Sequence, residues 1–195
     1  MTAFRKALIA MTACLSMASV QAAQVDVQYS VSGSANNWVL DFSVTNNILS
    51  SSSGMDIYFF GVRLPARDIA GSPSGWNSNT WTIWNNSGYG GTDGFNNNWI
   101  AGANGAPEEV QFGETLSGFL VNVMTATAPL SVDWFAYGYG DTYTGSFDDT
   151  VYDSLANPGF EGTAGEGTNG VPEPAALALL GLGLAGLAAT RRRKL

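Results

Sequence analysis

The sequence predicts an all-β protein whose main part, residues 23–161, is a single antiparallel β-sandwich. Several segments alternate apolar and polar residues with a period of two, which is the pattern of a strand with one buried face. Turn-forming segments rich in Gly, Asn and Ser separate them. Between the two ends of the chain, no segment of useful length has the 3.6-residue period of an amphipathic helix. These three observations together indicate two packed sheets.

The predicted strands follow one another at short intervals. Residues 25–31 (VDVQYSV) and 38–45 (WVLDFSVT) form a hairpin around a turn at 33–36. The next strand is long and central, and it stops before Pro65. That strand and the later ones are expected at 55–64, 80–84, 110–112, 115–124 and 131–138. Strands at this spacing in about 140 residues are typical of a jelly-roll or immunoglobulin-like sandwich.

The N-terminal residues 1–22 predict a secretory signal peptide. Arg5 and Lys6 precede a mostly apolar segment, 7–20, and small residues stand at a cleavage position after Ala22. A lipoprotein signal built on Cys14 is the alternative, although residues 11–13 lack the Leu usual before such a cysteine. Because Cys14 is the one cysteine of the chain, cleavage after Ala22 leaves a thiol-free protein. That agrees with an exported domain that needs no disulfides.

The expected mature region is acidic and lacks the residue types of many catalytic sites. Residues 23–170 contain 15 acidic residues against Arg63 and Arg67, a net charge of −13, and they contain no His, Cys or Lys. This composition excludes a His- or Cys-dependent nucleophile, a His/Cys zinc site and a lysine Schiff base. It also argues against nucleic acid as a partner, since phosphate binding needs a cationic face.

The C-terminal end is the most specific part of the sequence. Residues 162–170 (GTAGEGTNG) predict a flexible linker, and the prolines of 171–174 (VPEP) exclude regular helix. Residues 175–190 are uncharged and predict an apolar helix, whose roughly 15 apolar residues would be about 22 Å long. A hydrocarbon core is about 30 Å thick, a gap that snorkelling arginines and local thinning can close. The basic end, 191–194, should stay cytoplasmic and leave the main domain outside.

This order of parts resembles the PEP-CTERM sorting signal of Gram-negative bacteria. The resemblance covers residues 171–195 and implies recognition by an exosortase, a membrane-embedded transpeptidase related to cysteine proteases. It further implies transient anchoring in the inner membrane by the C-terminal helix, removal of the tail near the motif, and delivery to the cell surface or extracellular matrix. The residues that carry it are the motif and the basic end, namely Val171, Pro172, Glu173, Pro174, Arg191, Arg192, Arg193 and Lys194.

Residues 71–107 have an unusual composition, because they hold four of the six tryptophans among many Asn, Gly and Ser residues. An exposed Trp beside Asn or Asp stacks on sugar rings, so Trp76, Trp81 and Trp84 are candidate carbohydrate-binding residues. The strand expected at 80–84 would place Trp81 and Trp84 on opposite faces. The alternative is that these tryptophans only fill the core beneath a long loop.

Carboxylates are the remaining candidates for catalysis or metal binding. A pair of them can hydrolyse a glycoside, but most acidic residues of an exported domain form a solvated surface, and no catalytic residue is assigned. Calcium is a possible cofactor, although residues 141–149 (DTYTGSFDD) lack the alternating acids of an EF-hand loop. The acids considered for catalysis are Glu108, Glu109, Glu114, Asp133, Asp141, Asp148 and Asp149, of which Asp141, Asp148 and Asp149 are the calcium candidates.

These features predict an exported cell-surface or extracellular-matrix protein that is sorted by an exosortase. Its expected role is that of a non-catalytic carbohydrate-binding or structural component of exopolysaccharide or biofilm. The alternative is a secreted carbohydrate-active enzyme that uses paired carboxylates. The expected partners are the exosortase, the inner membrane through the tail, and an exopolysaccharide.

Overall fold

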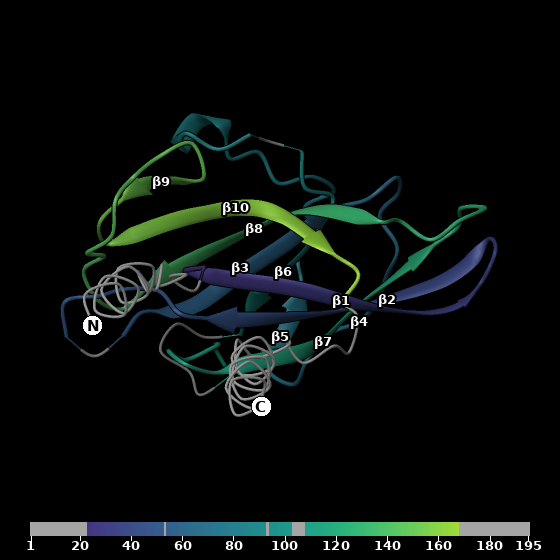
Figure 1. The fold of residues 1–195 in the computed structure, drawn as a ribbon, viewed down its shortest axis with the longest axis horizontal. Coiled ribbons are helices and arrows are strands. Elements are labelled where there is room, and N and C mark those ends of the chain that lie inside the picture. Colours follow the sequence, from purple (N-terminus) through teal and green to yellow (C-terminus); the bar gives the residue numbers. More distant parts are fainter. Residues whose placement is uncertain (1–22, 53, 93, 103–107, 168–195) are drawn as a thin grey trace, which may run out of the picture.

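The computed structural model describes residues 23–52, 54–92, 94–102 and 108–167, which form two antiparallel sheets packed face to face (Figure 1). This confirms the predicted β-sandwich. The elements in chain order are β1 (Val25–Ser34), β2 (Asn37–Asn46), β3 (Asp56–Arg63), β4 (Ile69–Gly71), β5 (Trp76–Ser78), the 3-10 helix η1 (Ser87–Tyr89), β6 (Asn97–Ala101), β7 (Thr115–Val123), β8 (Ser131–Tyr139), β9 (Val151–Ser154) and β10 (Asn157–Gly165).

The smaller sheet has the strand order β1-β2-β7-β4, and the larger one has the order β5-β6-β3-β8-β10-β9. The predicted hairpin of β1 and β2 is present and pairs Val25 with Asn46 through to Ser34 with Asn37. Its turn contains Asn36 at φ 62°, a left-handed conformation that Asn tolerates better than most residues. In Figure 1, η1 lies on the far side of β10 and β8 from β7, so it belongs to the outer side of the larger sheet.

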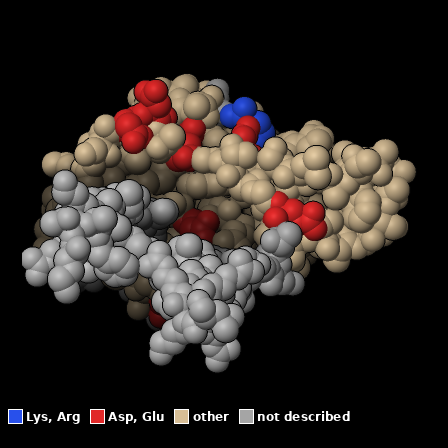
Figure 2. Space-filling view, in the orientation of Figure 1, with Lys and Arg blue, Asp and Glu red and all other residues tan. Residues whose placement is uncertain are grey.

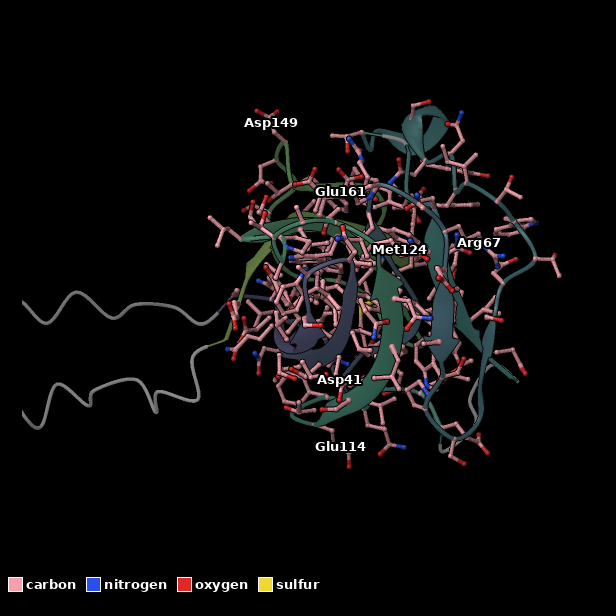
Figure 3. All side chains as sticks on the ribbon, turned by 90° about the vertical axis from the view of Figure 1, so that its right-hand side faces the viewer. Asp41, Arg67, Glu114, Met124, Asp149 and Glu161 are labelled. Atoms are coloured by element: carbon pink, nitrogen blue, oxygen red, sulfur yellow. The ribbon has the colours of Figure 1, made fainter. Side chains whose placement is uncertain are left out.

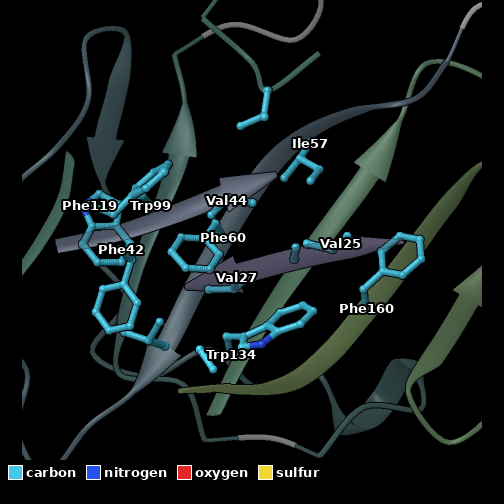
Figure 4. Close-up of a cluster of buried hydrophobic side chains, with 14 of the residues drawn as sticks. Val25, Val27, Phe42, Val44, Ile57, Phe60, Trp99, Phe119, Trp134 and Phe160 are labelled. Atoms are coloured by element: carbon cyan, nitrogen blue, oxygen red, sulfur yellow. The ribbon is translucent and has the colours of Figure 1, made fainter. Parts of the chain in front are cut away.

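The main core fills the space between the two sheets. On β2 and β7 every second residue points inward, because successive side chains of a strand alternate between its faces. Aromatic rings from both sheets meet in the centre, where Phe60 of β3 lies 5.0 Å from Phe119 of β7 and stacks on Trp99 at 5.9 Å. Figure 4 shows this cluster between the strands, including Phe42, Trp134 and Phe160.

The larger sheet is buried on both faces in its central strands. Along β3, Phe59, Phe60, Gly61 and Val62 are all buried in succession, and residues 134–138 of β8 are buried in the same way. A strand with one solvated face would alternate instead. Another segment of the chain therefore covers the outer face of this sheet. The candidate site lies between that segment and the sheet.

Two predicted strands are absent from the described structure. Residues 80–83 bend instead of forming a strand, and only Trp84 makes an isolated bridge, to Phe95. Residues 110–112 likewise contribute only the bridge between Val110 and Ile57. The strands β4, β5, β6 and β9 were not predicted, because they are only three to five residues long and too short to show a period of two. Strand β10 was not predicted because its glycines are typical of turns.

The domain extends beyond its predicted end at residue 161. Strand β10 runs to Gly165, Glu166 bridges to Tyr29, and the backbone N–H of Gly167 donates to the carbonyl of Tyr29 at 2.8 Å. The prediction of a flexible linker at 162–170 is therefore wrong for residues 162–167. Its remainder, residues 168–170, lies outside the described residues, as do the signal peptide, the sorting motif and the apolar helix. Within the described part of the chain, no helix has the length and hydropathy needed to cross a membrane.

Candidate functional site

The outer face of the larger sheet carries a second aromatic cluster, separate from the main core. We call it the outer aromatic cluster; its buried members come from β3, β8, β9 and the segment before β6, and they are Phe59, Phe95, Phe135, Tyr137 and Tyr152. Tyr58, Trp84 and Ile100 are partly buried against it. Phe59 contacts Phe135 edge to face at 4.8 Å. Burial of these apolar side chains therefore stabilises a segment that packs on the outer face of the sheet.

Residues 79–92 and 94–96, here called the covering loop, lie over this cluster. The side chain of Glu161, on β10, holds the loop through three hydrogen bonds. Its Oε1 accepts from Nδ2 of Asn86 at 2.5 Å and from the backbone N–H of Thr92 at 2.9 Å, and its Oε2 accepts from the Thr92 hydroxyl at 2.6 Å. Asn86 is fully buried and also donates to the Tyr152 hydroxyl at 2.7 Å. A carboxylate that accepts several hydrogen bonds is a strong local anchor.

Three aromatic rings of the covering loop stack on one another. Trp81 and Trp84 have ring centroids 5.1 Å apart and planes 18° apart, and Trp84 and Tyr89 have centroids 6.2 Å apart and planes 11° apart. Trp84 is fixed to the sheet by an edge-to-face contact with Phe59 at 5.0 Å. Trp81 remains 46% exposed and Tyr89 54% exposed. The loop therefore presents two aromatic side chains to solvent around a ring that the sheet holds in place.

A pocket of about 190 Å³ opens between this stack and the sheet. Its wall is mostly aromatic, and its polar side chains come from the β9–β10 hairpin. The lining residues are Tyr58, Phe59, Trp81, Trp84, Tyr89, Ile100, Tyr137, Asp153 and Asn157. An apolar wall with a few polar groups that fix orientation is the usual composition of a small-ligand site.

The phenol groups of Tyr58 and Tyr137 in this pocket are held neutral. Burial is the main cause that raises the pKa of Tyr58; the negative charge of Asp153 raises it further, and a hydrogen bond with Asn157 lowers it. Burial likewise raises the pKa of Tyr137, and Asp153 again adds to the effect. These hydroxyls therefore stay protonated and can donate hydrogen bonds at physiological pH.

The pocket wall contains no basic side chain among the described residues. Arg63 packs over the ring of Phe95, with 5.1 Å from its Cζ to the ring centroid, and lies 4.0 Å from the Asp133 carboxylate. Arg67 donates to the backbone carbonyl of Asn79. On the face shown in Figure 2, acidic groups are spread widely and basic groups lie together at one edge. Asp153 is the one charged side chain among the described residues that line the pocket.

Of the three tryptophans predicted to bind carbohydrate, one is in the main core and two line the pocket. Trp76 is only 4% exposed; its indole N–H donates to the carbonyl of Glu108 at 2.5 Å, and its ring packs edge to face on Phe119 at 5.0 Å. Its prediction as a site residue is wrong, because β5 places it in the main core. Trp81 and Trp84 do lie together at the pocket. The prediction that they face opposite sides is wrong, because residues 80–83 are not a strand.

Sequence reasoning missed the other seven residues that line the pocket, namely Tyr58, Phe59, Tyr89, Ile100, Tyr137, Asp153 and Asn157. The signal that could have located this face is the unbroken apolar run in 57–62 (IYFFGV), repeated in 134–137 (WFAY). Such runs indicate a strand that is covered on both sides. These runs predict a covered outer face. They do not predict that the β9–β10 hairpin supplies polar groups to the pocket.

The carboxylates proposed for calcium serve as hydrogen-bond acceptors for neighbouring loops. Asp141 accepts from the Ser51 hydroxyl at 2.6 Å, from the Ser52 backbone N–H at 2.8 Å and from the Thr142 backbone N–H at 2.7 Å. These bonds, that of Ser51 foremost, hold its pKa well below the usual range. Asp148 accepts from Thr150 and Val151 in the same manner, while Asp149 points outward (Figure 3). The described residues contain no group of three carboxylate, His or Cys side chains that could hold a metal ion.

Three of the remaining acids considered for catalysis, Glu108, Glu109 and Glu114, lie between β6 and β7, and Asp133 lies on β8. Glu109 is buried and accepts from the Tyr139 hydroxyl at 2.9 Å, and Asp133 lies beside Arg63. Glu114 is exposed just before β7 (Figure 3). Glu108 contributes its backbone carbonyl to Trp76. None of these acids lines the aromatic pocket.

A larger cavity of about 510 Å³ lies elsewhere, against Gln24, Trp134, Tyr143 and Asp148. It borders Ala23, where the described chain begins. We base no site on it.

Comparison with known proteins supports the interpretation of the C-terminal end. Residues 170–194 match the family of the PEP-CTERM protein-sorting motif. The match confirms the resemblance found in the sequence. It marks an exported protein that is anchored through its tail and has an exosortase as its processing partner.

No curated protein matches the chain. Among solved structures, the chain is similar to an uncharacterized protein from Nocardia farcinica with an immunoglobulin-like fold, at 18% identity and a TM-score of 0.39, covering 73% of this chain and 98% of the other.

Proposed function

We propose that this exported, exosortase-sorted chain is a non-catalytic surface or matrix protein that binds saccharides in the pocket beneath the covering loop. One observation carries the proposal: Trp81 and Tyr89 present exposed rings on either side of a fixed Trp84, next to the side chains of Asp153 and Asn157. Aromatic faces match the apolar face of a sugar ring, and amide and carboxylate groups match its hydroxyls. The export of the chain agrees with a ligand in the extracellular matrix.

A single site of this kind should bind weakly. Each exposed ring contributes on the order of 1 kcal/mol, so two rings and two polar side chains correspond to a Kd in the high micromolar to millimolar range. Many copies of the protein along one polysaccharide would still bind firmly, because linked weak contacts add up. Weak single-site affinity is therefore compatible with a structural role in a polymer matrix.

The test is oligosaccharide binding by the full-length protein in detergent, measured by isothermal titration calorimetry. Trp81→Ala should lower the affinity about five- to tenfold, which corresponds to the loss of one stacking contact. Its melting temperature should change little, because Trp81 is half exposed. Phe112→Ala is the matched control: Phe112 is also an exposed aromatic residue, and it does not line the pocket.

Two results would contradict the proposal. Either no oligosaccharide binds at millimolar concentration, or Trp81→Ala binds as well as the unchanged protein. Release of reducing ends during the titration would instead support the alternative of a carbohydrate-active enzyme, because a binding protein leaves its ligand intact.

A further inference from the structure

The charge of the pocket restricts which saccharides fit it. Asp153 is the one charged residue among those that line the pocket. Neither described arginine lines the pocket: Arg63 contacts Asp133 and the ring of Phe95, and Arg67 donates to the backbone carbonyl of Asn79. Residues 23–170 carry a net charge of −13. An acidic polysaccharide would therefore meet repulsion from the pocket and from the rest of the domain.

The same pocket is favourable for a cation. Aromatic faces attract a positive charge through their quadrupole, Trp most strongly. Five of the residues that line the pocket have aromatic rings suited to this contact, namely Tyr58, Trp81, Trp84, Tyr89 and Tyr137. A carboxylate at the rim of an aromatic cage adds an opposite charge within reach. A cage of this composition is the usual way in which proteins hold an organic ammonium group.

The backbone around Asp153 places its carboxylate at this rim. Asp153 has φ 76°, a left-handed conformation that is uncommon outside glycine, and it pairs with Pro158 across the β9–β10 hairpin. Its charge is close enough to raise the pKa values of both Tyr58 and Tyr137, although burial is the larger cause in each case. An irregular backbone next to a binding pocket often serves to orient one side chain.

The size of the pocket limits the ligand to a small unit. Its volume of about 190 Å³ is below the roughly 300–1,000 Å³ of sites that enclose drug-sized molecules. One sugar residue of a longer chain is therefore the largest unit that it can enclose.

We infer that the pocket binds a saccharide that carries a protonated amine, namely a de-N-acetylated hexosamine residue within a polymer, in preference to a neutral or acidic sugar. This inference rests on the proposed function and names its ligand class. The sugar ring stacks on Trp81, the ammonium group lies between the aromatic faces and Asp153, and Asn157 accepts from or donates to a neighbouring hydroxyl.

The test compares two tetrasaccharides, one of glucosamine and one of N-acetylglucosamine, by calorimetry on the full-length protein in detergent. The glucosamine oligomer should bind about tenfold more tightly, and added salt should reduce that difference. Asp153→Asn should make the difference smaller, because it lowers the affinity for the glucosamine oligomer more than the affinity for the N-acetylated oligomer. Asn is the chosen replacement because it tolerates the left-handed backbone at this position.

Asp149→Asn is the matched control, since Asp149 is an exposed acid that does not line the pocket. Equal binding of the two oligomers, with Trp81→Ala weakening both, would overturn this inference and leave the proposed function intact. An equal effect of Asp149→Asn and Asp153→Asn would also overturn it, because the preference would then come from diffuse surface charge. Binding of neither oligomer would refute both proposals.

Discussion

At the scale of single residues, the tryptophans show what decides between core and site. Trp76 and Trp81 stand in similar surroundings of Asn and Ser in the sequence, yet one is buried against Phe119 and the other is half exposed. The difference depends on β5 pairing with β6, a strand that begins about 20 residues later. Short-range patterns contain no information on such a pairing, because strand preference depends on tertiary context. The sequence could therefore identify the tryptophan-rich segment, but not sort its members.

Asp141 shows a residue whose hydrogen bonds make stability depend on pH. Its pKa is lowered in the folded state, so the stabilisation is present above the unfolded value of about 3.9 and is lost as the pH falls through the folded value. Asp141→Asn should therefore lower the melting temperature at neutral pH and flatten its decline below about pH 4. Asp149→Asn serves as the exposed control in thermal denaturation followed by circular dichroism. A variant with an unchanged melting curve at both pH values would contradict this role.

At the scale of elements, strand β10 explains why the domain boundary was misplaced. Residues 162–167 contain several glycines and are easily taken for a linker. The structure gives one of these glycines a packing role: a Cβ on Gly162 would lie 2.6 Å from the Trp134 ring. Glycine can mark a strand where another group approaches closely, and composition alone does not separate this case from a flexible segment. The long alternating strands β1, β2 and β7 were predictable because one face of each is buried and the other is not.

The covering loop is an element that depends on one side chain for its position. Glu161→Ala would remove the acceptor for Asn86 and for both donors of Thr92. We expect a loss of about 1–3 kcal/mol in the free energy of unfolding, because the buried Asn86 amide loses one of its two acceptors. Hydrogen exchange of residues 86–92 should become faster, and oligosaccharide affinity should fall, since Trp84 and Tyr89 flank this attachment point. Glu161→Gln keeps one acceptor oxygen and should retain part of each property.

Exchange rates and affinity that do not differ between Glu161→Ala and the unchanged protein would show that the loop is held in another way. Glu166→Ala provides the control on the same segment of chain, because Glu166 is exposed and lies outside the loop contacts. Changes confined to Glu161→Ala would tie the effect to the loop and not to the loss of one acidic residue.

At the scale of the whole molecule, the two ends of the described chain lie on the same side (Figure 3). The backbone of Gly167 is hydrogen-bonded to Tyr29, so the ordered domain reaches that residue. Only the four residues 168–171 separate it from Pro172, the first residue of the Pro-Glu-Pro triplet in the sorting motif. Four extended residues span at most about 14 Å. The folded domain must therefore stand close to the motif while the exosortase acts on it.

This short distance predicts that processing depends on spacer length. Deleting residues 168–170 would bring the domain against the motif, and we expect the unprocessed form to accumulate because the enzyme loses room to reach its substrate. Inserting six residues of Gly and Ser after Gly167 should leave processing as fast as before or faster, because flexible linkers cost little to extend. The measurement is a pulse-chase in the native host, with the processed and unprocessed forms separated by gel electrophoresis.

Replacement of Pro172, Glu173 and Pro174 by alanine supplies the reference for complete loss of processing. The PEP-CTERM match predicts that this triple variant stays full length in the membrane fraction. If the deletion of residues 168–170 is processed at the normal rate while the alanine variant is not, the enzyme recognises the motif without regard to the domain beside it. If the deletion behaves like the alanine variant and the insertion restores processing, the folded domain sets the distance at which the exosortase can act.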